Sequence, residues 1–326
     1  MNLNRLRIKC IGFSVTTFGK PNYAQAMQKY FDERCVGVEM THASVGGLSV
    51  DALPYLLESI IKRDQADLVI LEVATSWFSL VRKNEVEADG YIGLIVQYLE
   101  SIGVAILFLN MYRKDIEDED IIVKSIKKYS KDKYSIIDFK SHFRKLLIDM
   151  GDDGTTDGVH PKPEVIDFIA AKVCNEIFEN LPNYRKFITE LITPSAYHLN
   201  TFNILEESKY TFDNHSGLVL DCRKIFQGDK IVITNRSKMR ISGIFYLMGP
   251  DTNQLEIYLD GKHINIPMRD ASSYYRRLGY RYLGVHECSE VILVHSTENL
   301  EVKLTREPWE KVESLCNYVV GFSCHI

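Results

Sequence analysis

Apolar and polar positions follow two kinds of pattern over the first 190 or so residues. Residues 68–73 and 104–109 are almost continuous runs of leucine and branched apolar side chains, which is typical of strands buried on both faces. Residues 163–181 instead repeat their apolar side chains every three to four positions, as one face of a helix does. Weaker patterns predict strands over residues 7–13, 37–40 and 135–138, and helices over residues 23–33, 52–63, 90–101 and 121–130. Strands that alternate with helices in this way predict a parallel sheet covered by helices, an α/β fold.

The pattern changes to short strands after about residue 200. Strands are expected over residues 218–220, 230–234, 241–248, 255–259, 263–266, 290–294 and 301–304, with turn residues between them. Asp260-Gly261 lies between two of these strands and is a strong hairpin signal, because a type I′ turn needs positive φ at both central positions. A helix is expected only over residues 308–316. This half therefore predicts an antiparallel β-sandwich or jelly roll.

The chain is expected to fold as two domains, residues 1–190 and residues 200–326. Its length suits two domains, and the connector over residues 180–201 holds two prolines without a clear period. Hydrophobic residues make up 45% and charged residues 25%, the balance of a soluble globular protein. The net charge of −5, from 39 basic and 44 acidic residues, gives no electrostatic reason to expect a nucleic-acid or anionic-membrane partner. No apolar run approaches the roughly 18–20 residues that a membrane-spanning helix needs.

The seven cysteines are scattered, odd in number and never form a Cys-x-x-Cys pair. This spacing indicates neither a disulfide framework nor a zinc site. We expect free thiols in a reducing compartment, no bound metal and no cofactor. Arg5, Arg7 and Lys9 precede an apolar stretch, as in a signal peptide, but residues 11–17 are too short and too polar for its hydrophobic region. A cytoplasmic protein is therefore expected.

Residues 157–161, with the sequence Asp-Gly-Val-His-Pro, carry the clearest chemical signal. They lie just before the last predicted helix of the α/β half, and their glycine and proline favour a compact turn. Such a turn can place the Asp157 carboxylate against Nδ1 of His160, which fixes the tautomer of the imidazole and stabilises the cation formed when the ring takes a proton. A base of this kind needs a nucleophile. Ser14 follows the first predicted strand, where open α/β sheets place their ligands.

These positions together resemble the SGNH (GDSL-type) hydrolase family, over roughly residues 5–180. Four blocks stand in the family's order, namely Gly-Phe-Ser at 12–14, Ser-Val-Gly-Gly-Leu-Ser at 44–49, Leu-Glu-Val-Ala-Thr-Ser at 71–76 and Asp-x-x-His at 157–160. The resemblance implies a flavodoxin-like, three-layer α/β domain. It also implies a catalytic triad with Ser14 as nucleophile, His160 as base and Asp157 as the partner of the base.

The oxyanion hole that the resemblance implies departs from the family pattern. It consists of the backbone N–H groups of Ser14 and of Gly46 or Gly47, together with the side chain of Ser76. The family usually has Asn where Ser76 stands, and a serine hydroxyl donates one hydrogen bond but reaches less far than an amide. Losing an oxyanion donor typically costs about 10²–10³ in rate. Phe13 replaces the family's usual Asp after the glycine, but that carboxylate is not the nucleophile.

The resemblance implies acyl-ester chemistry on a carbohydrate, through an acyl-serine intermediate. With water as the acceptor the enzyme is an esterase, and with a sugar hydroxyl it is an O-acetyltransferase; the same triad serves both outcomes. The alternatives are a non-catalytic glycan-binding or assembly protein that keeps the fold, and a lipase or thioesterase acting on hydrophobic acyl chains. The appended β domain favours a glycan over a lipid.

Candidate substrate contacts come from aromatic and arginine side chains. Tyr274, Tyr275 and Arg277 concentrate these groups in the β half, where aromatic faces stack on sugar rings and guanidinium groups donate to hydroxyls or carboxylates. The alternative is a tyrosine-rich strand whose arginines face solvent. Trp77 can wall a small acyl pocket or pack in the core. An oligomer interface, if one exists, is expected on the β domain.

Overall fold

The computed structural model describes residues 6–17, 19–34, 36–62, 66–75, 85–111, 121–130, 134–139, 154–190, 209–214, 217–234, 240–312 and 314–325. The chain divides into two compact units. Met1–Tyr197 with Ser216–Leu218 form unit 1, and His198–His215 with Val219–Ile326 form unit 2. Each unit has its own sheets and its own hydrophobic core.

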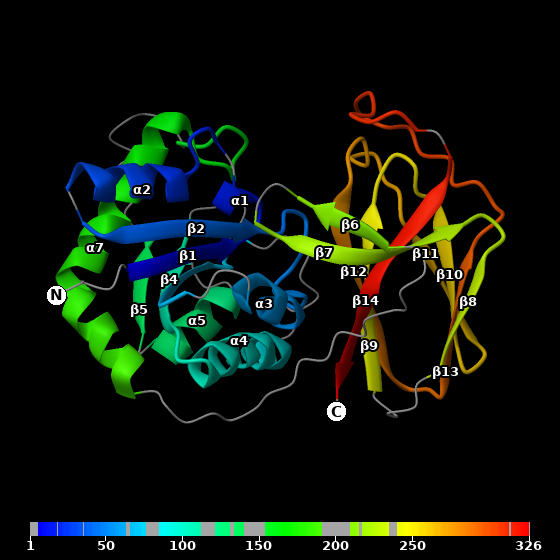
Figure 1. The fold of residues 1–326 in the computed structure, drawn as a ribbon, viewed down its shortest axis with the longest axis horizontal. Helices are drawn as coiled ribbons and strands as arrows, with labels where there is room; N and C mark the ends of the chain where they lie inside the picture. The colour runs from blue at the N-terminus through cyan, green and yellow to red at the C-terminus, as the bar shows by residue number, and fades with distance from the viewer. Residues whose placement is uncertain are drawn as a thin grey trace. The chain divides into compact units, whose positions relative to one another are not determined.

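Unit 1 is built on a five-stranded parallel sheet with the strand order β2-β1-β3-β4-β5 (Figure 1). Its strands are β1 (Leu6–Gly12), β2 (Val38–Ser44), β3 (Leu68–Glu72), β4 (Ala105–Asn110) and β5 (Ser135–Asp138). Every neighbouring pair is parallel, and Cys10 of β1 lies between His42 of β2 and Ile70 of β3. This is the strand order of flavodoxin-like sheets, so the α/β fold that the sequence predicts is confirmed. The carboxyl ends of all five strands lie at one edge.

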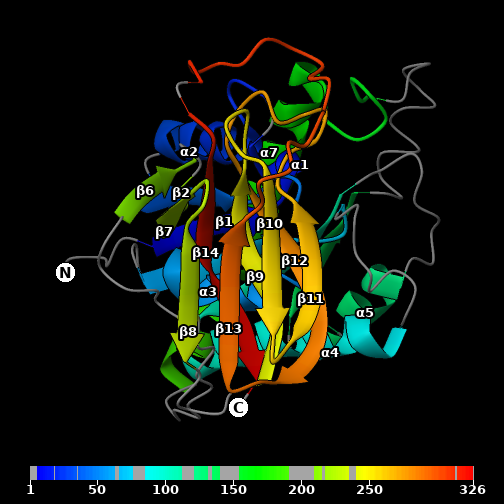
Figure 2. The same ribbon diagram turned by 90° about the vertical axis from the view of Figure 1, so that its right-hand side faces the viewer.

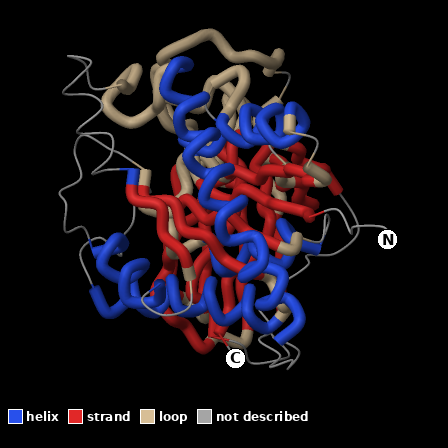
Figure 3. Tube along the Cα trace, turned by 90° about the vertical axis from the view of Figure 1, so that its left-hand side faces the viewer, coloured by secondary structure: helices blue, strands red, loops and turns tan. Residues whose placement is uncertain are grey.

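Helices cover both faces of this sheet (Figures 1 and 3). The described helices are α1 (Ser14–Thr17), α2 (Tyr23–Glu33), α3 (Leu53–Lys62), α4 (Glu85–Ser101), α5 (Ile121–Ser130) and α7 (Pro163–Glu190). Helices α2 and α7 pack on one face, and α3, α4 and α5 lie on the other. Helix α7 continues through Pro182, beyond its predicted end at residue 181. A proline inside a helix removes one backbone hydrogen bond, and this helix of 28 residues continues in spite of that loss. Among the described helices, none is both long and apolar enough to cross a membrane.

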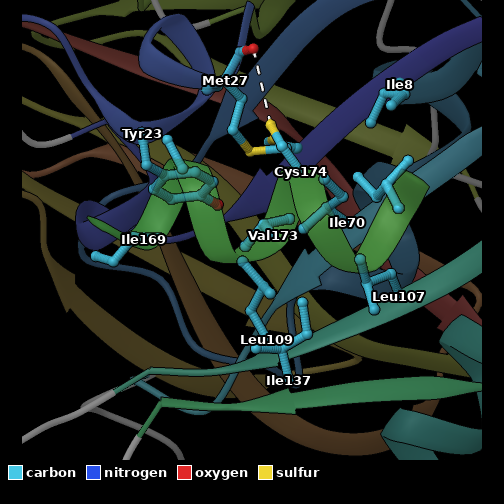
Figure 4. Close-up of a cluster of buried hydrophobic side chains, with 14 of the residues drawn as sticks. Ile8, Tyr23, Met27, Ile70, Leu107, Leu109, Ile137, Ile169, Val173 and Cys174 are labelled. Atoms are coloured by element: carbon cyan, nitrogen blue, oxygen red, sulfur yellow. Dashed lines mark hydrogen bonds between the residues drawn. The ribbon is translucent and has the colours of Figure 1, made fainter. Parts of the chain in front are cut away.

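The core of unit 1 lies between the sheet, α2 and α7 (Figure 4). Apolar side chains from the strands meet those of the two helices, and each one labelled in Figure 4 is at most 4% exposed. Those labelled in Figure 4 are Ile8, Ile70, Leu107, Leu109 and Ile137 from the strands, and Tyr23, Met27, Ile169, Val173 and Cys174 from the helices. The Cys174 thiol donates to the Met27 carbonyl at 3.8 Å and so joins α7 to α2. Each fully buried aliphatic side chain contributes about 1.5–3 kcal/mol, so this layer holds α2 and α7 firmly against the sheet.

Unit 2 is an antiparallel β-sandwich of two sheets (Figure 2). One sheet has four strands in the order β11-β10-β13-β8, and the other has five in the order β12-β9-β14-β7-β6. The strands are β6 (Lys209–Asp213), β7 (Val219–Phe226), β8 (Lys230–Thr234), β9 (Arg240–Met248), β10 (Gln254–Leu259), β11 (Lys262–Pro267), β12 (Arg277–Glu287), β13 (Glu290–His295) and β14 (Cys316–His325). A separate core, with Ile244, Leu255, Leu293 and Phe322 among its members, draws side chains from both sheets.

The hairpin predicted at Asp260-Gly261 is confirmed. Its two residues have φ of 44° and 88°, as a type I′ turn requires. They join β10 to β11, with Leu259 opposite Lys262. The turn chemistry of two residues was therefore enough to locate this loop from the sequence.

Two elements predicted for the β half are wrong. Residues 301–304 alternate polar and apolar side chains but form no strand, because alternation alone supplies no neighbouring strand to pair with. The described residues of the segment 308–316 form no helix. The N–H of Trp309 donates to the Tyr274 carbonyl at 2.8 Å, and that of Cys316 donates to the Asp251 carbonyl at 2.8 Å, so both bond to distant segments.

Two strands, β6 and β14, were not predicted, and β12 corresponds to the tyrosine-rich strand that was offered as an alternative. Strand β14 shows most clearly why a strand can be missed. Strand β14 pairs with β7 on one side and β9 on the other, and most of its residues are buried. A central strand covered on both faces has no alternation of polar and apolar positions to reveal it.

Candidate active site

The candidate nucleophile lies where β1 turns into α1. Strand β1 ends at Gly12 and α1 begins at Ser14, at the carboxyl edge of the parallel sheet. The turn is tight: a Cβ added to Gly12 would lie 2.1 Å from Oγ1 of Thr16 and 2.7 Å from the carbonyl oxygen of Glu72. The N–H of Thr16 donates to the Phe13 carbonyl at 3.0 Å and closes the turn. Only glycine fits at position 12, which explains the glycine two residues before the serine.

The glycine turn after β2 lies directly beside Ser14. The N–H of Val45 donates to the Gly12 carbonyl at 3.0 Å, which joins the two turns. A Cβ added to Gly46 would lie 3.8 Å from both Cα and Cβ of Ser14, so a side chain at this position would touch the serine. Gly47 has φ of 82°, a left-handed conformation that favours glycine. The structure thus brings Gly46 against Ser14 and gives Gly47 a conformational role in the same turn.

The Asp157–His160 turn has the geometry that its sequence predicts. Nδ1 of His160 donates to Oδ2 of Asp157 at 2.7 Å. The other carboxylate oxygen accepts the backbone N–H groups of Val159 at 3.1 Å and His160 at 2.9 Å. Gly158 has φ of 84°, and its N–H donates to the hydroxyl of Thr155 at 2.9 Å. The imidazole therefore has a fixed tautomer, in which Nε2 is the nitrogen that can take up a proton.

The charge of Asp157 is secured by these bonds. Burial alone would raise the pKa of Asp157, because it disfavours the charged form. The hydrogen bonds from the backbone and ring of His160, with that from Val159, outweigh the burial and hold the pKa of Asp157 below its ordinary value of 3.8. The carboxylate is therefore ionised at neutral pH and stabilises a protonated His160.

Both turns rest on the same core. Val15 and Val159, the chain neighbours of the candidate nucleophile and base, pack against one cluster of buried side chains beneath α2 and α7. Gly19, in the loop after α1, also approaches α7: a Cβ added there would lie 2.5 Å from Cδ1 of Ile166. Ile166 belongs to the first turn of α7, the helix that follows the Asp157–His160 turn. One hydrophobic layer therefore supports the segments that carry the two groups.

Ser76 and Trp77 lie outside the described residues, so their predicted roles as oxyanion donor and pocket wall stay predictions. The described chain before them ends in a buried turn after β3. Oε1 of Glu72 accepts the N–H of Thr75 at 3.1 Å and its hydroxyl at 2.8 Å. This turn lies at the same edge of the sheet as Ser14.

Two hydroxyl groups at the site were not predicted from the sequence. The Ser44 hydroxyl donates to the Phe13 carbonyl at 2.7 Å, and Oγ1 of Thr17 lies 3.0 Å from the Ser44 oxygen. Ser44 stands in one of the four sequence blocks, but the pattern directed attention to its glycines. Only the register of β1 against β2, which places Gly12 opposite Ser44, shows that this serine reaches the nucleophile turn.

The aromatic residues predicted as substrate contacts form a cluster in unit 2. Tyr274 and Tyr275 have ring centroids 5.1 Å apart, and Trp309 lies 5.5 Å from the first and stacks on the second at 4.7 Å. The guanidinium of Arg306 lies 5.3 Å above the Tyr274 ring. Trp309 is 68% exposed, so a large part of the indole faces solvent. Sequence reasoning missed Trp309 because its segment was taken for a helix.

Arg277 is largely engaged within the protein. Its guanidinium bonds to Oδ2 of Asp270, and its side chain is 16% exposed. Asp270 also accepts the hydroxyl of Ser273 and the N–H of Ser272. These contacts give Arg277 a role in fixing the segment before β12, whatever else it binds.

The chain was compared with known proteins. No protein-family model matches it, and no curated protein matches it significantly. Among solved structures, a two-domain esterase active on acetylated mannans, co-crystallised with mannopentaose, is 16% identical; the match covers 98% of this chain and 92% of that chain, with a TM-score of 0.64. A second structure of a two-domain esterase active on acetylated mannans is 15% identical over the same shares, with a TM-score of 0.63. An acetyl xylan esterase is 17% identical and matches 53% of this chain and 100% of its own, with a TM-score of 0.45.

The first two matches establish a shared fold over both units. The chain has the fold of this two-domain esterase. The flavodoxin-like α/β fold that the four sequence blocks imply is thereby confirmed. The match also runs through the β-sandwich, so an α/β unit followed by a β unit is an arrangement with a precedent among solved structures.

Proposed function

We propose that this protein is a serine esterase that removes acetyl groups from a polysaccharide. The observation that carries the proposal is the 2.7 Å hydrogen bond between His160 and Asp157, in a turn supported by the same core as the Ser14 turn. A carboxylate-oriented imidazole has a specific use in proton transfer to and from a hydroxyl nucleophile. The SGNH fold and the contact between Gly46 and Ser14 fit the same chemistry.

The proposed reaction has two half-reactions. His160 takes the hydroxyl proton of Ser14 through Nε2 while Oγ attacks the ester carbonyl, and the N–H groups of Ser14 and Gly46 stabilise the resulting oxyanion. The C–O bond to the sugar then breaks, and His160 returns the proton to the departing sugar oxygen. Water repeats the sequence on the acetyl-serine, which releases acetate and restores Ser14. Asp157 keeps its charge throughout and stabilises the protonated imidazole.

The polysaccharide part of the proposal rests on unit 2. Tyr274, Tyr275 and Trp309 form a compact aromatic cluster with one strongly exposed indole. Flat aromatic faces stack on the apolar faces of sugar rings, and this stacking requires no charge on the sugar. The two-domain esterase with the same overall fold acts on acetylated mannans, which supports an acetylated polysaccharide as the substrate class.

The test uses a small ester and a polymer with the same set of variants. We expect the wild-type protein to hydrolyse p-nitrophenyl acetate and to release acetate from an O-acetylated mannan. Ser14→Ala should lower both rates to about a thousandth or less, since the covalent step then has no nucleophile. Ser125→Ala is the matched control, because Ser125 is a buried serine of the same unit whose hydroxyl bonds to Asp89. Wild-type rates equal to those of Ser14→Ala would overturn the proposal.

The same assay separates the alternative functions. An O-acetyltransferase would move acetyl from the donor to an added sugar in preference to water, which product analysis detects. A lipase or thioesterase would act faster as the acyl chain grows beyond about four carbons, because burial of each CH₂ adds about 0.8 kcal/mol of binding. A glycan-binding protein without catalysis would keep its glycan affinity in His160→Ala. The cytoplasmic location stays a prediction, tested by fractionation of the cells that make the protein.

A further inference from the structure

Ser44 is a buried residue with a directed pair of hydrogen bonds. It is the last residue of β2 and only 2% exposed. Its hydroxyl donates to the Phe13 carbonyl at 2.7 Å, which uses its single hydrogen. In the 3.0 Å contact between Thr17 and Ser44, the threonine is therefore the donor. The result is a chain of hydrogen bonds that runs from Thr17 through Ser44 to Phe13.

The end of this chain acts on the same peptide unit as an oxyanion donor. The carbonyl of Phe13 and the N–H of Ser14 belong to one planar trans peptide, so they point in opposite directions. Whatever fixes the direction of the Phe13 carbonyl also fixes the direction of the Ser14 N–H. A hydrogen bond to the carbonyl also polarises the peptide and strengthens the N–H as a donor. The N–H of Thr16 bonds to the same carbonyl at 3.0 Å, so Ser44 adds a second, shorter hydrogen bond that contributes to both the direction and the donor strength of the Ser14 N–H.

Ser44 also links the two turns that supply the donors. It directly precedes the turn that contains Gly46, and the N–H of the next residue, Val45, bonds to the Gly12 carbonyl at 3.0 Å. Two adjacent residues of one segment therefore bond to two adjacent carbonyls of the other. This double link fixes the distance between the N–H of Ser14 and that of Gly46. Oxyanion stabilisation depends on donors held in place before the reaction.

We propose that Ser44, supported by Thr17, is the positioning residue of the oxyanion hole. It acts through the Phe13–Ser14 peptide and does not touch the substrate. The inference rests on the proposed esterase function. It predicts that the hydroxyl of Ser44 matters most in the transition state, when negative charge develops on the carbonyl oxygen, and little in the binding of the uncharged ester.

The test compares variants that keep or remove each hydroxyl. For p-nitrophenyl acetate, Ser44→Ala should lower kcat by about 10- to 100-fold with KM changed less than about twofold, since a misaimed donor costs less than a deleted one. Ser44→Thr, which retains a hydroxyl, should recover most of the lost kcat. Thr17→Val should lower kcat about 2- to 10-fold, and Thr17→Ser should restore it. In the double variant Ser44→Ala/Thr17→Val the losses should not add, because Thr17 acts through Ser44.

A second measurement distinguishes positioning from general damage. The reaction of an aryl phosphonate with Ser14 passes through a charged transition state of similar shape. Its rate should therefore fall in parallel with kcat in the Ser44 and Thr17 variants. Ser125→Ala, with a comparable buried hydroxyl removed far from the turn, should change neither rate. Equal kcat values for wild type and Ser44→Ala would overturn this inference and leave the proposed function intact. An inactive wild type would overturn the proposed function itself. If Ser44→Ala does not fold, the inference is tested by the Thr17 variants, and equal kcat values for Thr17→Val and Thr17→Ser would overturn it.

Discussion

At the scale of single residues, the chemistry depends on hydrogen bonds that span very few positions. Asp157 accepts three donors from residues no more than three positions away, so its geometry depends little on the rest of the fold. Ser14 is the opposite case. Its turn lies where β1, β2 and β3 end, and a Cβ on Gly12 would collide with Thr16 of α1 and with Glu72 at the end of β3. The candidate base is therefore held by a local structure, whereas the surroundings of the candidate nucleophile depend on the tertiary structure.

The pKa of Asp157 leads to a prediction for pH dependence. Because this pKa lies below 3.8 in the folded protein, the carboxylate is ionised at every pH above about 4. Asp157→Asn should therefore lower kcat/KM by about 10²- to 10⁴-fold at neutral pH, where the wild-type carboxylate is charged and an amide cannot stabilise a protonated His160 in its place. The factor should shrink towards acid pH, because the wild-type carboxylate itself becomes protonated below its lowered pKa. The measurement is a pH profile of both proteins, and equal kcat/KM values at neutral pH would contradict the prediction.

At the scale of elements, several helices and strands have the bounds that the sequence predicts, even where the pattern was weak. The helices at Tyr23–Glu33 and Ile121–Ser130 and the strands at Ser135–Asp138 and Lys230–Thr234 coincide with their predictions. Helix α2 also has a capping box, in which the side chains of Asn22 and Gln25 each accept the other's backbone N–H. Helix α4 begins five residues before its prediction and includes two glycines, which weaken a helical pattern.

Those two glycines of α4 provide a matched pair of variants. Gly90 is exposed and a Cβ added there would meet nothing within 4 Å, whereas a Cβ on Gly93 would lie 2.6 Å from the hydroxyl oxygen of Tyr129. Gly90→Ala should raise the free energy of unfolding by about 0.5–1 kcal/mol, the usual gain in a helix interior. Gly93→Ala should lose that gain, because Tyr129 must move and its bond to the Asp89 carbonyl weakens. Denaturant unfolding of both variants measures the difference, and equal stabilities would contradict it.

At the scale of the whole molecule, the chain combines two units with different architectures. Unit 1 holds the groups proposed for the reaction, and unit 2 has its own core and an aromatic cluster that the proposed reaction does not use. Two contacts with a segment more than 30 positions earlier hold the residues around Trp309 in place: the N–H of Trp309 bonds to the Tyr274 carbonyl, and Glu310 pairs with Arg276. An exposed aromatic side chain on an anchored segment is suited to bind a repetitive polymer.

This division of labour predicts a difference between polymeric and small substrates. Trp309→Ala should raise KM for the acetylated polysaccharide about 3- to 10-fold, as expected when about 0.5–1.5 kcal/mol of stacking is lost. The increase in KM should be clearly smaller for p-nitrophenyl acetate, which has no sugar ring to stack on the indole. Val232→Ala, at another exposed apolar side chain of unit 2, is the control and should change neither value. An equal loss on both substrates would count against glycan stacking.

The sequence by itself determined the features that depend on nearby residues. The α/β and β-sandwich classes followed from periodicity, the hairpin at Asp260-Gly261 from turn chemistry, and the Asp157–His160 pair from a spacing of three residues. Each of these signals is contained within one element or one turn. Physical forces that act over a few bonds leave a pattern that can be read along the chain.

Only the tertiary structure decided which distant residues meet. The register of β1 against β2 places Ser44 and Gly46 at the Ser14 turn, and the path of residues 308–316 was settled by a hydrogen bond to Tyr274, 35 positions before Trp309. Strand β14 was invisible in the sequence because burial on both faces removes alternation. Pairings of this kind depend on the packing of whole layers, which no local pattern records. The two domains were thus predictable from chain length and periodicity, whereas the contacts around Ser14 on which the proposed esterase function rests were decided by the tertiary structure.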